Sequence, residues 1–129
     1  MARLLIIDDD MAFLHAMSEM LGRHLPDAHV DVSGSAAEAL YLITIHQYDM
    51  VMCDIEMPHV DGFAMLSRIK HKDPQKPVLL VTGHVDDTLE QAARDGGAAG
   101  LIRKPMERDS VLRQLRSLLS TRDVQPDDR

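Results

Sequence analysis

Five short apolar runs, each followed by a longer segment with helical spacing, constrain the fold of this chain more than any other feature of its sequence. The runs occupy residues 4–7, 29–32, 50–53, 78–81 and 100–102. Runs that are apolar at nearly every position are typical of strands buried on both faces of a parallel sheet. The second run is half polar, which predicts an edge strand. This alternation predicts an α/β fold, a doubly wound five-stranded parallel sheet flanked by five helices.

The segments between the runs carry the start and stop signals of five helices. The first helix follows the acidic residues 8–10, which are placed to cap it, and the second opens with a capping-box pattern at residues 35–38. The apolar stripe of the second helix consists of Ala36, Ala39, Leu40 and Ile43. The other helices are expected from near Asp61 to the prolines at 74 and 77, over residues 86–95 and over about residues 107–120.

The length of 129 residues fits one compact domain. We expect residues 1–120 to form it and the polar residues 121–129 to be a C-terminal tail or the start of a linker. No output domain is expected within this chain. The single cysteine, Cys53, lies in an apolar run and is expected to be an inert core thiol without a disulfide partner.

Charge and hydropathy exclude several classes of partner. Lys and Arg number 14 against 21 for Asp and Glu, which gives a formal net charge of −7. This acidic balance argues against direct binding to nucleic acids or to anionic membranes. No apolar run approaches the ~20 residues of a membrane span, and the N-terminus shows no signal-peptide pattern. The expected compartment is therefore the cytoplasm.

The residues with chemistry to offer follow the ends of the predicted strands. They are Asp8 and Asp9 after the first run, Asp54 after the third, Thr82 after the fourth and Lys104 after the fifth. In open α/β sheets such positions meet at one edge. Two carboxylates at 4 Å repel by about 4 kcal/mol at an effective dielectric near 20, so a group of three calls for a cation. Hard oxygen ligands of this kind suit Mg²⁺, and the lysine adds a fixed positive charge.

In these positions the sequence resembles the response-regulator receiver domains of two-component signalling. The resemblance covers residues 3–120, and its motifs match in order and spacing: IDDD at 7–10, MCDIEMP at 52–58, DG at 61–62, VTG at 81–83 and KP at 104–105. It implies a flavodoxin-like sheet with strand order 2-1-3-4-5.

The resemblance also implies a chemistry for the carboxylates. Asp54 would be the phosphoacceptor and would receive a phosphoryl group from a phosphohistidine of a sensor histidine kinase or histidine phosphotransfer protein. Asp9 and Asp54 would ligate Mg²⁺ directly together with the backbone carbonyl of Glu56, while Asp8 would act through a bound water. Such a chain is a switch rather than an enzyme, because it catalyses only its own phosphorylation and dephosphorylation.

Further roles follow from the same resemblance. Lys104 would contact the phosphoryl group, Thr82 would move to hydrogen-bond it, and the Lys104–Pro105 peptide bond would be cis. The phosphorylated domain would then present an altered face to a downstream output domain or protein. Glu56 and His84 lie two residues beyond signature positions, where receivers vary and set the lifetime of the phosphoryl group.

Leu101 departs from the family pattern. Receivers commonly carry Tyr or Phe three residues before the signature lysine, and the ring moves inward together with the threonine. The leucine predicts weaker coupling between phosphorylation and the surface of the fourth helix.

Three other functions compete with this interpretation. Mg²⁺-dependent phosphohydrolases with an aspartate nucleophile carry Asp-x-Asp-x-Thr on the first strand, but Ala12 stands here in place of the Thr and no cap segment is present. A flavodoxin-like FMN binder lacks its Ser/Thr/Gly-rich loop, and three acids there would repel the phosphate. A receiver-like domain that only binds partners is disfavoured because all signature residues are retained.

Overall fold

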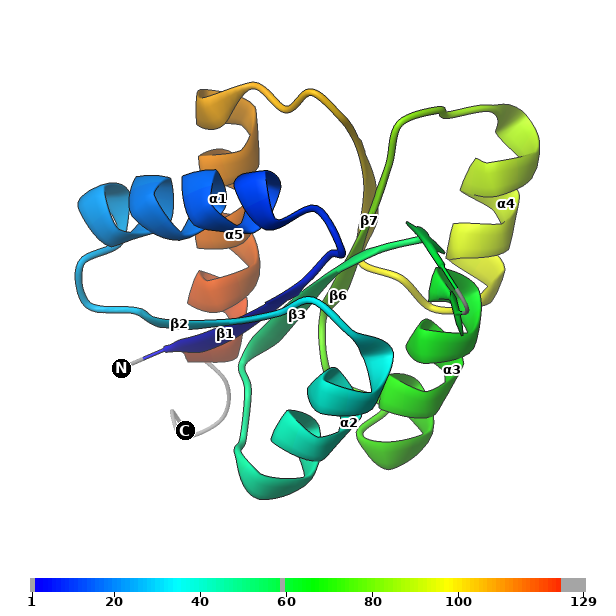
Figure 1. The fold of residues 1–129 in the computed structure, drawn as a ribbon, viewed down its shortest axis with the longest axis horizontal. Helices are drawn as coiled ribbons and strands as arrows, with labels where there is room; N and C mark the ends of the chain where they lie inside the picture. Colours follow the sequence, from blue (N-terminus) through cyan, green and yellow to red (C-terminus); the bar gives the residue numbers. More distant parts are fainter. Residues whose placement is uncertain (1, 59, 124–129) are drawn as a thin grey trace.

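The computed structural model describes residues 2–58 and 60–123, and it shows one five-stranded parallel sheet covered by helices on both faces (Figure 1). The sheet has the order β2-β1-β3-β6-β7, with the bounds β2 (His29–Ser33), β1 (Arg3–Ile7), β3 (Met50–Asp54), β6 (Val78–Thr82) and β7 (Gly100–Arg103). Counted among these five strands, this is the predicted order 2-1-3-4-5. The half-polar run forms the edge strand β2, as predicted.

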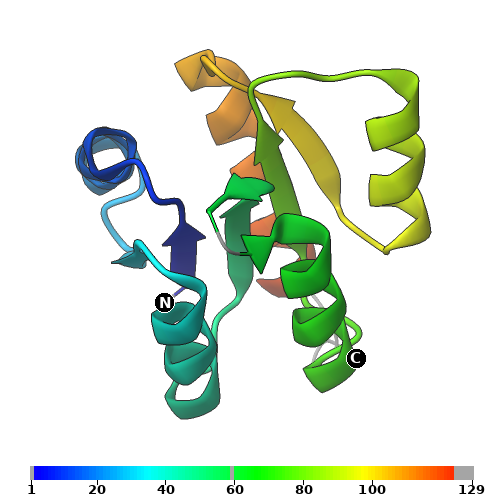
Figure 2. The ribbon, with the colours of Figure 1, turned by 45° about the vertical axis from the view of Figure 1, so that its right-hand side comes forward.

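Two helices cover one face of the sheet and three cover the other. The helices are α1 (Met11–His24), α2 (Ala36–Ile45), α3 (Gly62–Lys72), α4 (Asp87–Asp95) and α5 (Arg108–Asp123). Figures 1 and 2 show α1 and α5 together on one side, with α2, α3 and α4 on the opposite side. The predicted doubly wound fold is therefore confirmed.

The core consists of two apolar clusters separated by the sheet. Successive side chains of a strand point to opposite faces, so Leu5 and Ile7 pack towards α2 and α3 while Leu4 and Ile6 pack towards α1 and α5. All five residues of β3 and all five of β6 are buried. Each fully buried aliphatic side chain stabilises the fold by about 1.5–3 kcal/mol, which makes these central strands a rigid base for the loops that follow them.

Side-chain caps begin four of the helices. The capping carboxylate or hydroxyl accepts a hydrogen bond from a backbone N–H of the first turn; the caps are Asp10, Ser35, Asp61 and Asp86. The capping box predicted for α2 forms only in part. Glu38 does not reach back to the cap but accepts a hydrogen bond from the Ser33 hydroxyl at 2.9 Å.

Two features differ from the prediction. Two short strands, β4 (Glu56–Met57) and β5 (Val60–Asp61), form an antiparallel pair directly after β3. Gly62 follows this pair and lies very close to Ile55, because a Cβ atom added to Gly62 would sit 2.3 Å from the Ile55 Cα. Helix α5 continues to Asp123, beyond the predicted end near residue 120. The rest of the predicted tail, residues 124–129, lies outside the described residues.

A polar network fixes the edge strand. The Asp31 carboxylate accepts hydrogen bonds from the Tyr48 hydroxyl at 2.6 Å and from the Arg3 guanidinium at 3.1 Å. Burial alone would raise the pKa of Asp31, but the hydrogen bonds from Tyr48, Arg3 and His29 outweigh it and lower the pKa. The network ties β2 to β1 and to the segment that enters β3.

Candidate functional site

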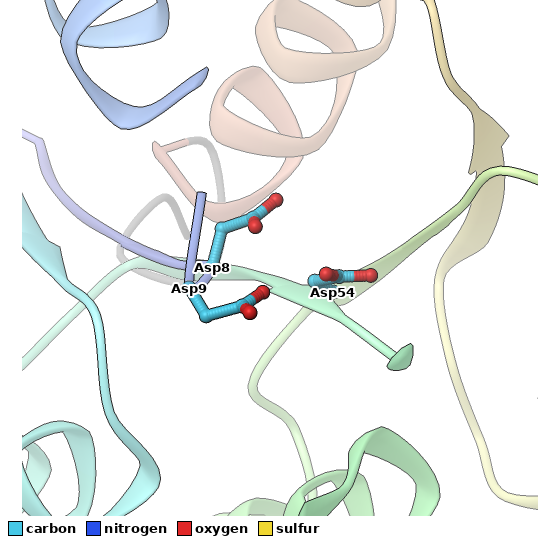
Figure 3. A group of neighbouring side chains, drawn as sticks. All are labelled: Asp8, Asp9 and Asp54. Carbon is cyan, nitrogen blue, oxygen red and sulfur yellow. The ribbon is translucent and has the colours of Figure 1, made fainter. Parts of the chain in front are cut away.

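Three carboxylates meet at the carboxyl edge of the sheet. Asp8 and Asp9 follow β1 directly, and Asp54 ends the neighbouring strand β3, where Ile7 pairs with Cys53. One oxygen from each carboxylate lies within 4.8 Å of the others, and Figure 3 shows Asp8 and Asp9 extending towards the side on which Asp54 lies. Asp8 is 1% exposed and Asp54 5% exposed, whereas Asp9 is open to solvent. The topology thus brings together the three carboxylates predicted to take part in the metal site.

Lys104 supplies the positive charge of this cluster. Its Nζ lies 2.6 Å from Asp8 Oδ2, 3.9 Å from Asp54 Oδ2 and 4.3 Å from the centre of the Phe13 ring. Burial alone would lower the pKa of Lys104, but the hydrogen bond and charge of Asp8, with the charges of Asp54 and Asp10, raise it. The ammonium group is therefore charged at neutral pH. The peptide bond between Lys104 and Pro105 is cis, as predicted.

The surroundings of Asp54 disfavour its ionised form. Burial and the neighbouring charges of Asp8 and Asp9 raise its pKa, against the opposing effects of Lys104 and of the Glu56 N–H, which donates to Asp54 Oδ1 at 3.1 Å. Three carboxylates face one ammonium group here. A divalent cation would offset the remaining repulsion.

The donor set fits magnesium. Mg²⁺ uses hard oxygen ligands, takes one or two carboxylates and keeps several waters, which suits one exposed and two buried carboxylates. The backbone of Glu56 lies beside the cluster, because its N–H contacts Asp54. The residues present therefore form an acidic pocket that can hold a metal.

Thr82 lies at the same edge, at the end of β6, and is fully buried. Its hydroxyl lies 3.3 Å from Glu56 Oε1 and 2.9 Å from the carbonyl oxygen of His84, and accepts a hydrogen bond from the His84 N–H at 3.1 Å. The same Glu56 oxygen accepts a hydrogen bond from the Gly83 N–H at 3.1 Å. One carboxylate oxygen therefore holds two successive residues of the loop after β6.

The contact between Glu56 and Thr82 was not predicted from the sequence. The prediction gave Glu56 a backbone role and a general influence on lifetime, without a partner for its carboxylate. The pairing of β3 with β6 could have indicated this contact, because it brings the segments after these two strands side by side.

The two remaining predicted residues lie outside the carboxylate cluster. His84 is exposed, and its Nε2 lies 3.3 Å from Asp86 Oδ2. Leu101 is half-buried on β7, pairs in register with Leu80 and packs against the cluster that includes Ala93 of α4. Its side chain thus packs at the interface between the sheet and α4.

Comparison with known proteins assigns this arrangement to a family. The family model of the response regulator receiver domain matches residues 4–116. The chain therefore belongs to the response regulator receiver domain family, the signalling domains of two-component systems. A CheY-like receiver domain protein from Methanospirillum hungatei shares the fold, with a TM-score of 0.89 at 24% identity over 98% of this chain and 99% of that one.

Two regulators show the similarity at the level of sequence. The C4-dicarboxylate transport transcriptional regulatory protein DctD of Rhizobium meliloti is 36% identical over 86% of this chain and 24% of its own length. The response regulator protein FleR of Pseudomonas aeruginosa is 37% identical over 86% of this chain and 23% of its own length. The chain thus spans about a quarter of these relatives. In the described part of the chain, no helix is both long and apolar enough to cross a membrane.

Proposed function

We propose that this receiver domain is a phosphoacceptor switch in which Asp54 takes a phosphoryl group from a phosphohistidine of a sensor histidine kinase or histidine phosphotransfer protein. The observation that carries the proposal is the buried Asp54 carboxylate at a strand end, in one cluster with Asp8 and Asp9 and 3.9 Å from the Lys104 ammonium. In the transfer, an Asp54 oxygen forms a bond to phosphorus while the phosphorus–nitrogen bond of phosphohistidine breaks. The departing imidazole nitrogen keeps the electron pair and takes up a proton.

The proposal includes Mg²⁺ as the cofactor. Asp9 and Asp54 would hold it directly, with the backbone carbonyl of Glu56, and Asp8 would act through a water molecule. The ion supplies charge neutralisation, and Lys104 stabilises the phosphoryl oxygens from the other side. The acidic pocket supports this role, because its repulsion is lowest with a divalent cation bound.

Thr82 would carry the signal away from Asp54. Once the phosphoryl group is present, the Thr82 hydroxyl would donate to it and leave its present contacts with Glu56 and His84. The moved loop would change the surface that a downstream output domain or protein recognises. We place this output outside the chain, with no direct nucleic-acid contact by the receiver itself and with the cytoplasm as the compartment.

Phosphorylation by a small donor tests the proposal. With acetyl phosphate and Mg²⁺, the intact mass should rise by one phosphoryl group, and Asp54→Asn or omission of Mg²⁺ should abolish the rise. Asn keeps the shape of the side chain, so a loss of folding does not confound the result. A phosphoryl adduct that persists in Asp54→Asn would refute the assignment. Turnover of phosphomonoesters would instead favour a phosphohydrolase.

A further inference from the structure

Helix α2 is apolar on nearly all sides but lies at the surface. Eight of its ten residues, AAEALYLITI, are apolar, yet only Ala39 is buried. Tyr41 is 62% exposed and Ile45 is 49% exposed, and the two lie one turn apart. Helices that are apolar all round are normally covered by other parts of a protein. The sheet and its neighbouring helices leave this one partly uncovered.

Helices α2 and α3 lie side by side in both views (Figures 1 and 2), and their side chains line a groove between them. Two adjoining cavities of about 520 and 550 Å³ form it, and both are lined by Ile43, Thr44, Ile69 and Lys72. One of the cavities extends along α2 to Leu40, and the other reaches past Ile45 to residues 46 and 47. Aliphatic side chains of both helices, Ile43 and Ile45 from α2 and Ile69 from α3, thus contribute to this α2–α3 groove, and the rest of its lining is mostly polar.

The rim of the groove on the α3 side is basic. It carries Arg68, His71 and Lys72, all of them exposed, on a helix without any acidic residue. Among the residues that the structure describes, no carboxylate pairs with these three side chains; the nearby Asp73 instead lies 3.5 Å from Lys76 Nζ. The rim is thus locally positive although the formal net charge of the chain is −7.

We propose that the α2–α3 groove binds an amphipathic helix of a partner protein whose apolar face packs on α2 and whose acidic residues face the basic rim of α3. Apolar anchors in a groove of this kind give affinity, and the complementary charge selects the partner. A second copy of this chain fits less well, because a two-fold contact through this surface would bring two basic rims together.

The groove is separate from the carboxylate cluster. Asp54 lies at the carboxyl end of β3, whereas the groove reaches the C-terminal ends of α2 and α3, where the chain returns to enter β3 and β6. The inference therefore does not rest on the proposed phosphorylation, and the groove is expected to bind its partner in Asp54→Asn as well.

The test uses a synthetic helical peptide with leucines along one face and glutamates on the other positions. Titrated into the isotope-labelled protein, it should shift amide signals at residues 40–47 and 67–76. Arg68→Glu with Lys72→Glu should weaken binding by about tenfold or more, and Ile45→Ser, which removes an exposed apolar side chain of the groove lining, should also weaken it. These side chains are exposed, so the variants should fold. Arg94→Glu with Arg113→Glu, equally exposed but on α4 and α5, is the matched charge control and should bind normally.

A second peptide, with lysines in place of the glutamates, distinguishes selection by charge from non-specific hydrophobic binding. It should bind at least about tenfold more weakly than the acidic peptide. The proposal fails if the acidic peptide does not bind at millimolar concentration, if its shifts map to another face, or if both peptides bind equally. It also fails if the wild type binds neither peptide but self-associates, or binds phosphatidylglycerol vesicles, and Ile45→Ser abolishes that association.

Discussion

Among single residues, Glu56 has the most specific consequence for the proposed switch. One of its oxygens accepts from Gly83 N–H and lies beside the Thr82 hydroxyl, so the side chain holds the loop in its present position. We expect Glu56→Ala to raise the rate of amide hydrogen exchange at Gly83 about fivefold, since a net hydrogen bond contributes about 1 kcal/mol. Glu56→Gln should exchange like the wild type, because the amide oxygen still accepts.

The same two variants separate hydrogen bonding from charge. If the acceptor holds the loop, Glu56→Ala should phosphorylate faster with acetyl phosphate and Mg²⁺, and Glu56→Gln should behave like the wild type. Equal acceleration in both variants would mean that the negative charge of Glu56, and not its hydrogen bonds, opposes the phosphoryl group. Exchange at Gly83 is measured without phosphorylation, so it remains informative whatever the fate of Asp54.

Two glycines provide a matched pair for stability. A Cβ at Gly62 would meet the Ile55 backbone at 2.3 Å, whereas a Cβ at Gly22 in α1 would meet nothing within 4 Å. Gly62→Ala should lower the free energy of unfolding by about 1–3 kcal/mol through overpacking. Gly22→Ala should raise it by about 0.5–1 kcal/mol because alanine favours the helix. Urea unfolding measures both, and equal effects would contradict the close approach at Gly62.

At the scale of elements, the network around Asp31 makes the attachment of β2 dependent on pH. The pKa of Asp31 is lowered in the folded state, so its contribution to stability is present above the unfolded pKa, near 3.8. That contribution is lost as the pH falls through the lower, folded pKa. The difference in unfolding free energy between the wild type and Asp31→Asn should therefore be constant near pH 6 and shrink below about pH 4.

Urea unfolding from pH 6 to pH 3 measures this difference. Other carboxylates titrate in the same range, but their contribution cancels when the two proteins are compared at each pH. Tyr48→Phe removes one donor to Asp31 while it keeps the ring, and should show a smaller pH-dependent difference of the same sign. A difference that grows on acidification would contradict the lowered pKa.

The elements also show which parts of the fold the sequence determines. The strands that are buried on both faces were predicted because every position of β3 and β6 is apolar or lies at the strand end. The β4–β5 pair was not predicted, because each strand has only two residues, too few to show an alternating pattern in the sequence. The stripe of α2 was predicted correctly as a helix face, yet of its members only Ala39 is buried.

In the whole molecule, the carboxylate cluster was within reach of the sequence because parallel strands end at one edge. Asp8, Asp9, Asp54 and Lys104 were all expected there, and the structure brings them together. The sequence could not predict that Lys104 pairs more closely with Asp8 than with Asp54. The distances from its Nζ, 2.6 Å to Asp8 Oδ2 and 3.9 Å to Asp54 Oδ2, are set by the loop after β7. The basic rim of the groove was not predicted, because the net charge of the whole chain does not show where basic residues gather in the fold.

We expect the extent of the response to the proposed phosphorylation to depend on Leu101. An aromatic ring there could move between an exposed and a buried position and couple Thr82 to α4, with a tyrosine hydroxyl to favour the surface. Leucine has no polar tip, and it already packs against the apolar cluster beneath α4. We expect it to stay there in both states, so that the change remains near the loops after β3 and β6.

Amide chemical shifts on phosphorylation measure this extent. In the wild type, the changes should concentrate at residues 54–60 and 82–87, and Asp54→Asn should show none of them. Leu101→Tyr restores the ring that the family commonly carries, and its changes should extend through residues 88–103, over α4 and β7. Large changes over residues 88–103 in the wild type, together with a new rotamer of Leu101, would show that leucine couples the two surfaces as well as a ring does.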